Sequence, residues 1–356
     1  MVSHLRAVNF RCWERLSVAL PEQGGIFVGQ NAQGKTSILE AVCVLLRLQS
    51  PRTHKMSSMI QMGHAGFGIA GEAWDMERKV RFSASGFACE VDGEVRDRSS
   101  AYLRDGGLVV WMGNEDLELV RGSGEVRRRY LDFIGVQWHP EYRLHWSRYR
   151  KAVKMKNALL KERSIDARQL EAIEELMIEH GEALAQLRRH MIERLSHLAH
   201  ESHQAVSGGS EMLDLAYRSA GSESLRESLG QAREREWRLR QSVVGPHRDD
   251  VVLQLNQLSA AEFASEGQQR TLALALKLAQ GALLQELGRM PIYLLDDIFG
   301  ELDAQRRNAL MSALPSQAQK WITTTTLDWW HQESSTRELA LHQVSDGAVV
   351  RSDGFR

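Results

Sequence analysis

The chain has 356 residues, 26% of them charged, and a formal net charge of −1, so we expect about two domains and no bulk polycation. Any nucleic-acid surface must therefore be a local patch. Three scattered cysteines without pairing or metal-ligand spacing are typical of a reducing compartment. Because no apolar run reaches the roughly 18 residues that span a bilayer and no signal peptide opens the chain, we predict a cytoplasmic protein without a membrane partner.

The first 114 residues have the pattern of strands around one helix, and we take 1–114 as the first part of an α/β lobe. Residues 2–20 predict a hairpin, and 66–95 alternate and contain Asp92-Gly93, a strong hairpin-turn signal. Residues 108–112 are apolar throughout, which indicates a buried strand.

A glycine-rich loop between an apolar strand at 25–28 and a helical pattern from 38 onward is the main motif of this part. It has the spacing of a phosphate-binding P-loop, in which backbone N–H groups surround an anion at a helix N-terminus. Lys35 can reach the β- and γ-phosphates, and the Thr36 hydroxyl can bind Mg²⁺. We predict that this loop binds ATP; its residues are Gly29, Gln30, Asn31, Ala32, Gln33, Gly34, Lys35, Thr36 and Ser37.

Residues 115–205 have helical periodicity, with one long helix over 171–200, and we predict an inserted helical arm over 115–243. The window 126–164 holds eleven Lys or Arg against three acids, with aromatic residues between them. Two interpretations stay open for the charges: phosphate-backbone contacts, or a solvated helix face. For the aromatic residues we favour a place in the core over base stacking.

A second anion site is predicted where the chain returns to an α/β pattern, in residues 244–356. Ser265 and Gln268 have the spacing of a capping box, and Gly267 permits a close backbone approach to a ligand. The helix that follows is apolar on nearly all faces, so we expect it to be buried. This helix start cannot reach phosphates already held by its own P-loop, so we predict that it contacts the ATP of a second subunit.

The third motif is an apolar run, 291–295, that ends in two carboxylates. When such a strand belongs to a parallel sheet, its terminal carboxylates lie at the edge of the sheet where ligands bind. We expect Asp296 to hold Mg²⁺ and Asp297 to orient or deprotonate the attacking water, with Lys35 as the third catalytic residue. Asp303 lies in the following loop, where it can contact a partner subunit. Residues 321–326 predict a last strand, and a residue at its end would sense the γ-phosphate.

Together these motifs resemble the RecF family, the DNA-repair members of the SMC-like ABC ATPases, over nearly the full length. The resemblance implies a P-loop ABC-type ATPase head with a mixed sheet and an inserted helical arm. The run Gly245 to Asp250 is the most specific feature, because generic ABC ATPases do not carry it. The other carrying segments are 9–11, 29–37 with 39–41, 52–53, 115–117, 127–128 with 131–132, 157–160, 267–270, 295–297 and 301–303.

The resemblance also implies partners and activity. It predicts ATP-dependent dimerisation, binding to single-stranded, gapped or duplex DNA, and work with RecO and RecR in the loading of RecA, with slow, DNA-stimulated ATP hydrolysis as a switch. Two alternatives share the same motifs: a soluble ABC-type ATPase subunit that couples hydrolysis to another partner, and a DNA clamp with vestigial hydrolysis.

Overall fold

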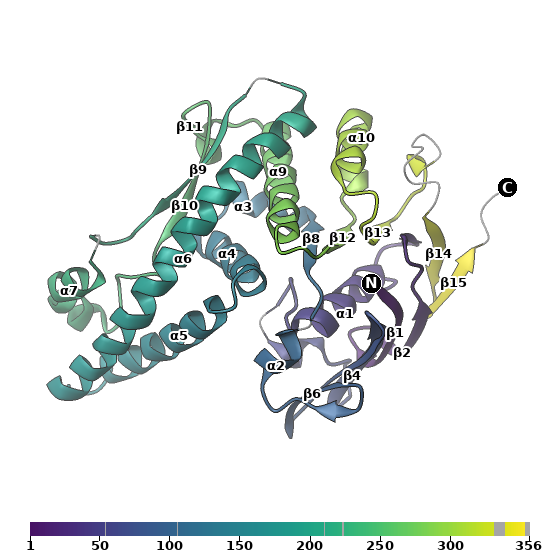
Figure 1. The fold of residues 1–356 in the computed structure, drawn as a ribbon. Helices are drawn as coiled ribbons and strands as arrows, with labels where there is room; N and C mark the ends of the chain where they lie inside the picture. The colour runs from purple at the N-terminus through teal and green to yellow at the C-terminus, as the bar shows by residue number, and fades with distance from the viewer. Residues whose placement is uncertain (54, 105, 210, 223, 331–338, 353–356) are drawn as a thin grey trace. The chain divides into compact units, whose positions relative to one another are not determined.

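The computed structural model describes residues 1–356 except 54, 105, 210, 223, 331–338 and 353–356. It divides into two compact units, a first unit of residues 1–114 and 284–356 and a second unit of residues 115–283 (Figure 1). The first boundary falls where the sequence pattern changes. The second boundary, 283/284, lies forty residues beyond the predicted 243/244.

The first unit contains two six-stranded sheets with helix α1 (Lys35–Arg47) in contact with strands of both. The antiparallel sheet has the order β2-β1-β4-β5-β6-β7. Its strands are β1 (Val2–Phe10), β2 (Trp13–Ala19), β4 (Gly66–Ala73), β5 (Met76–Ser83), β6 (Gly86–Val91) and β7 (Glu94–Val95). The predicted hairpins are confirmed, and Asp92 and Gly93 both adopt the positive φ that a tight hairpin turn needs.

The second sheet of this unit is mixed and has the order β15-β14-β3-β13-β12-β8. All its neighbours are parallel except the antiparallel β14–β15 pair. Its strands are β3 (Gly24–Val28), β8 (Val109–Gly113), β12 (Ile292–Asp296), β13 (Lys320–Thr324), β14 (Ala340–Ser345) and β15 (Ala348–Ser352). Every residue of β3, β8, β12 and β13 is buried, which explains the apolar runs 26–28, 109–112 and 292–295 within the first three of these strands.

The short helices of this unit are η1 (Met56–Met59), α2 (Ser99–Arg104), η3 (Phe299–Glu301) and α10 (Ala304–Ala313), and η2 (Asn114–Leu117) begins at its boundary. Strand β3 lies in the interior of the mixed sheet between β13 and β14. The loop after β3 and the loop after β12 therefore leave the same edge of one parallel sheet, where ligands bind in α/β folds.

The second unit is mainly helical, as the periodicity of residues 115–205 predicted. Helix α6 has 41 residues and runs along α5, which precedes it in the chain (Figure 1). The helices are α3 (Glu118–Arg121), α4 (Gly124–Trp138), α5 (Tyr142–Leu159), α6 (Ala167–Ser207), α7 (Leu225–Leu239), α8 (Ala260–Phe263) and α9 (Glu266–Gln285), whose last residues belong to the first unit.

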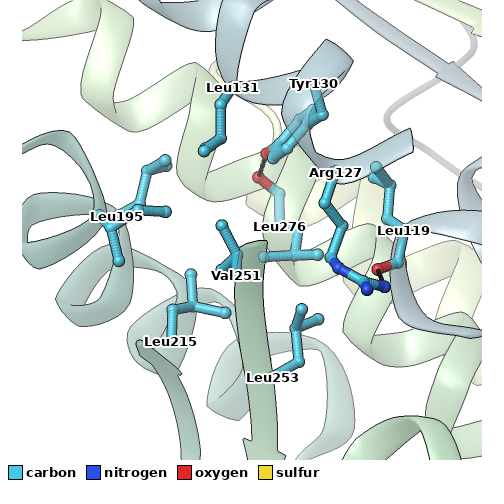
Figure 2. Close-up of a pocket in the computed structure, with 10 residues that line it drawn as sticks. Leu119, Arg127, Tyr130, Leu131, Leu195, Leu215, Val251, Leu253 and Leu276 are labelled. Atoms are coloured by element: carbon cyan, nitrogen blue, oxygen red, sulfur yellow. Dashed lines mark hydrogen bonds between the residues drawn. The ribbon is translucent and has the colours of Figure 1, made fainter. Parts of the chain in front are cut away.

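A small antiparallel sheet of order β11-β10-β9 completes this unit, from β9 (Leu213–Arg218), β10 (Asp250–Leu255) and β11 (Leu258–Ser259). Val251 and Leu253 of β10 and Leu276 of α9 belong to the same hydrophobic core as Leu195 of α6. They surround a cavity of only about 10 Å³, too small for a ligand (Figure 2). This shared core is why residues 244–283 belong with the helical unit.

No helix among the described residues is both long enough and apolar enough to cross a membrane.

Candidate nucleotide-binding site

The P-loop connects the end of β3 with the first turn of α1 and follows a path that only certain residues allow. Ala32 and Gly34 have φ of 65° and 94°. A Cβ atom on Gly34 would lie 2.6 Å from Sγ of Cys12 and 2.7 Å from Nε1 of Trp13. The same indole Nε1 donates to the Gly34 carbonyl at 3.2 Å, so the β1–β2 hairpin holds the loop in place.

Lys35 lies in the mouth of this loop with its side chain largely buried. Its ammonium donates to the carbonyls of Gly29 and Gln30 at 2.7 and 2.8 Å. An ammonium has three protons, so this arrangement leaves one for a phosphate oxygen. Burial lowers the pKa of Lys35, while the charges of Asp297 and Asp296 oppose that shift. A positive charge held at a helix N-terminus is suited to an anionic ligand.

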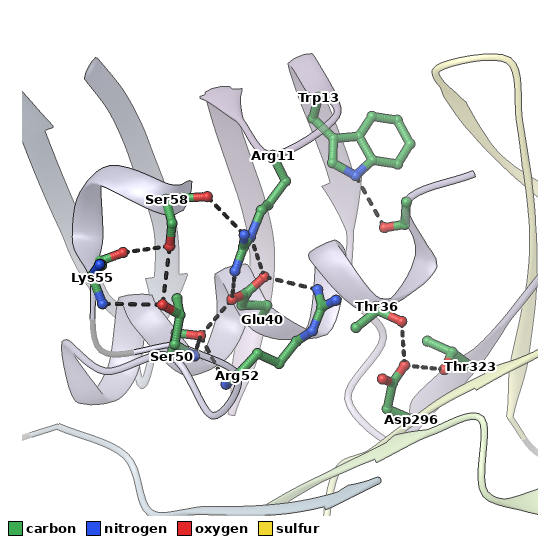
Figure 3. Close-up of polar contacts among 12 residues, drawn as sticks. Arg11, Trp13, Thr36, Glu40, Ser50, Arg52, Lys55, Ser58, Asp296 and Thr323 are labelled. Carbon is green, nitrogen blue, oxygen red and sulfur yellow. Dashed lines mark hydrogen bonds and ion pairs between the residues drawn. The ribbon is translucent and has the colours of Figure 1, made fainter. Parts of the chain in front are cut away.

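The structure brings the P-loop and the acidic strand together through Asp296. The Thr36 hydroxyl and the Thr323 hydroxyl each donate to Oδ1 of Asp296 at 2.7 Å (Figure 3). A hydroxyl beside a carboxylate is the oxygen-donor pair that Mg²⁺ takes from a protein when phosphates complete its coordination. Among the described residues, no group of three or more His, Cys, Asp or Glu could hold a metal by itself.

Asp297 is placed by the same threonine. Its backbone N–H donates to the Thr323 hydroxyl at 2.9 Å, and its φ is 51°, a conformation that a non-glycine residue adopts only when its surroundings hold it. Burial raises the pKa of the Asp297 carboxyl, Lys35 lowers it, and Glu301 raises it further. A carboxylate with a raised pKa beside Asp296 is suited to general-base chemistry.

A buried carboxylate, Glu40 of α1, organises the surroundings of the loop and was not predicted as a site residue. Arg11 binds it through two nitrogens at 2.6 and 2.8 Å. Ser50 donates to the same carboxylate and Arg52 approaches at 3.5 Å (Figure 3). The sequence contained a signal, because a Glu within an otherwise apolar buried helix needs basic partners. Arg11 and Arg52 were noted only for the family resemblance.

The remaining predicted loop residues and Asp303 have other local roles. Oε1 of Gln33 accepts from the Asp346 N–H at 2.9 Å, and the side chains of Gln30 and Asn31 are exposed. Asp303 caps helix α10 by accepting from the Arg306 N–H at 2.8 Å. Its predicted contact with a partner subunit stays a prediction.

The second predicted anion site, at the start of α9, has the local geometry of a capping box. Ser265 accepts from the Gln268 N–H at 3.3 Å, and Gln268 Oε1 accepts from the Ser265 N–H at 2.8 Å. The Gln268 amide also donates to Glu211 at 2.6 Å, which fixes its orientation. Ser265 is exposed and Gly267 is half-buried. This helix start is therefore preformed within the second unit.

The Gly245–Asp250 run forms a polar network with two other segments that carry the family resemblance. Arg127 forms a bidentate ion pair with Asp250, with N···O distances of 2.8 and 2.9 Å, and Arg128 donates to the Asp249 carbonyl at 2.7 Å. The Asp249 carboxylate accepts from the Tyr217 hydroxyl and from the Ala220 N–H. These side chains hold the short sheet against α4, so this part of the run has a structural role.

Asp132 and Arg188 form the buried centre of the same network. Arg188 donates to Asp132 at 2.6 Å and to the Pro246 carbonyl at 2.6 Å. The Tyr142 hydroxyl and the Trp146 indole also donate to Asp132, each at 2.7 Å. Tyr149 is buried as well. The interpretation of the aromatic residues as part of the core is confirmed for Tyr142 and Tyr149, which are fully buried. Trp146 is only half-buried and is held by its hydrogen bond to Asp132.

Comparisons with known proteins agree with this architecture. A family described as an AAA domain matches residues 4–259. The chain is 38% identical to the DNA replication and repair protein RecF of Thermosynechococcus vestitus, over 98% of both chains. The chain belongs to the RecF family. It is also 36% identical to RecF of Shouchella clausii, over 99% of this chain and all of that one.

Solved structures support the same assignment. The recombination mediator protein RecF with the ATP analogue ATPrS superimposes with a TM-score of 0.87 at 27% identity, over 99% of this chain and 98% of that one. An Smc head bound to the C-terminal winged-helix domain of ScpA shares the fold, with a TM-score of 0.57 at 16% identity. The predicted ABC-type ATPase head with an inserted helical arm is therefore confirmed.

Proposed function

We propose that this RecF-family chain is an ATP-dependent DNA-binding protein of recombination and repair. One observation carries the proposal: Thr36, Asp296, Thr323 and Asp297 are joined by hydrogen bonds directly beside the P-loop lysine. The RecF relative solved with ATP, at 26% identity and a TM-score of 0.86, supports ATP as the ligand.

Each residue of the site then has a role in binding and hydrolysis. The loop N–H groups and Lys35 bind the β- and γ-phosphates, and Thr36 with Asp296 would hold Mg²⁺, which would neutralise phosphate charge. Asp297 orients a water for attack on the γ-phosphorus and accepts its proton, while the bond to the β–γ bridging oxygen breaks and ADP leaves. The Thr323 hydroxyl holds Asp296 through its side chain and Asp297 through its backbone N–H, so it fixes the positions of both residues. Slow, DNA-stimulated turnover serves as a switch rather than as a continuous motor.

The preformed helix start at Ser265 and Gln268 supports a dimer that depends on ATP. In this proposal it binds the γ-phosphate held by a second subunit, and Asp303 contacts the partner subunit. Because the ligand is then part of the interface, ATP favours the dimer by mass action and hydrolysis releases it. The dimer binds gapped DNA and works with RecO and RecR, which promotes RecA loading; the RecFOR pathway named for the solved relative supports these partners.

Two measurements test the proposal. Sedimentation of the chain with ATP, with ADP and without nucleotide should give dimers only with ATP, and Lys35→Ala should abolish both ATP binding and dimerisation. Fluorescence anisotropy with a gapped duplex should show binding that requires ATP. A Lys35→Ala variant that still dimerises with ATP, or wild-type DNA affinity that is the same without nucleotide, would contradict it.

A further inference from the structure

The outward face of helix α5 has a concentration of positive charge that the fold does not compensate. The helix contains six Lys or Arg residues and no Asp or Glu. Arg148, Arg150, Lys151 and Lys154 are exposed, and none of the four makes an ion pair with any residue that the structure describes. The other half of the basic window differs, because Arg127 and Arg128 are engaged in the network around Asp249 and Asp250.

The neighbouring helix has acidic residues, but they bind elsewhere. Glu174 of α6 contacts the buried Lys156 at 2.9 Å and Arg233 of α7 at 2.9 Å. Glu175 binds Arg226 of α7 through both oxygens. Glu182 accepts from the Leu225 N–H at 3.3 Å. These acids of α6 therefore hold α7 in place, and among the described residues none of them pairs with the four exposed cations of α5.

A row of like charges repels itself, so an uncompensated basic face on a chain of net charge −1 is best explained by a polyanionic partner. We infer that this face, formed by Arg148, Arg150, Lys151 and Lys154, binds the phosphate backbone of duplex DNA. The inference rests on the proposed DNA-binding function and assigns part of the contact surface. Arg148, Lys151 and Lys154 follow each other at about 4.5 Å along the helix axis, within reach of successive phosphates of one strand.

The surrounding aromatic residues favour duplex over single-stranded DNA. Single-strand binding uses exposed aromatic rings on which bases stack. Here Tyr142 and Tyr149 are buried, and the Trp146 ring is anchored to Asp132 while the guanidinium of Arg150 lies over it, 4.8 Å from the ring centroid. The ring thus orients Arg150 and is covered by it. Such a face makes backbone contacts without reading the base sequence.

The triple variant Arg148→Gln/Lys151→Gln/Lys154→Gln tests this inference in the full-length chain with ATP. Loss of three phosphate contacts should make the slope of log K against log salt about three units less negative and weaken duplex binding on the order of 100-fold at 0.1 M salt. The matched control is Arg189→Gln/Arg235→Gln/Arg238→Gln, which removes the same charge from exposed positions of α6 and α7. Duplexes of equal length and unrelated sequence should be affected equally.

The outcomes separate the inference from the proposed function. If the wild-type chain binds no DNA with ATP, the proposed function fails. If wild type binds and the α5 variant keeps its affinity and salt slope, or loses no more than the control, only the role of α5 is overturned. A loss confined to single-stranded DNA would overturn it too. Unchanged circular dichroism and ATP-dependent dimerisation of the variant show that the loss does not arise from misfolding.

Discussion

Removal of Asp132 should unfold the second unit at much lower denaturant concentration. The Arg188 side chain is only 3% exposed, and its ion pair with Asp132 at 2.6 Å is the charged contact that compensates for its burial. Truncation of one partner of a buried ion pair costs about 3–5 kcal/mol, since the other charge stays buried and unpaired. Tyr142 and Trp146 also lose their acceptor, so we expect Asp132→Ala to lower the free energy of unfolding by about 4 kcal/mol.

Urea unfolding combined with hydrogen exchange of α4–α6 peptides measures this effect within the second unit. With an m-value of about 2 kcal/mol/M, the midpoint should fall by about 2 M. The control is Glu193→Ala on α6, whose side chain is 75% exposed and which should change stability by less than about 0.5 kcal/mol.

A double-mutant cycle makes the test stricter. When Arg188→Met is combined with Asp132→Ala, no unpaired charge remains, so the pair should be much less destabilised than the sum of the single variants. An Asp132→Ala loss below about 1 kcal/mol, or simple additivity in the cycle, would refute the role assigned to this ion pair.

Three further predictions concern the first unit. Asp297→Asn should still bind ATP and dimerise, but its turnover, followed by phosphate release, should fall about 100-fold or more because the general base is lost; near-normal turnover would remove Asp297 from that role. Gly34→Ala should weaken ATP binding, measured by calorimetry, by about 10-fold or more. The φ of 94° at Gly34 and the closeness of Cys12 and Trp13 leave no room for a Cβ atom. An unchanged Kd would argue against this loop geometry. Burial lowers the pKa of His342 to about 4, below the ordinary 6.5. The neutral imidazole therefore stabilises the fold fully above pH 6.5, and this contribution is lost as pH falls toward 4. Between pH 7 and pH 5 the free energy of unfolding of the wild type, measured in urea, should fall by about 2 kcal/mol more than that of His342→Phe, and equal losses would contradict the assignment.

The geometry of the candidate nucleotide site was predictable because its determinants are local. The P-loop spacing fixes a strand, a turn and the start of a helix in one short segment, and the apolar run before Asp296 and Asp297 identifies a buried parallel strand. The capping box at Ser265 is likewise set by residues three apart.

The features that sequence patterns missed depend on residues far apart in the chain. Glu40 meets Arg11 across 29 positions, and Arg127 meets Asp250 across 123. Charge patterns alone do not separate Arg127 and Arg128, which bind Asp250 and Asp249, from Arg148 and Lys151, which form no ion pair within the described part of the chain. The second unit extends past the predicted boundary 243/244 for the same reason: β10 looks like a strand of the ATPase lobe, but it pairs with β9.

The order in which the chain leaves the ribosome has a consequence for the mixed sheet. The P-loop strand β3 needs β13 and β14, whose residues are synthesised about three hundred positions later, whereas the second unit is built from one continuous stretch. The helical arm can therefore fold on a nascent chain while the P-loop still lacks its neighbours. A prematurely terminated product would consequently possess an arm but no complete mixed sheet, so its own P-loop strand would lack the strands that flank it.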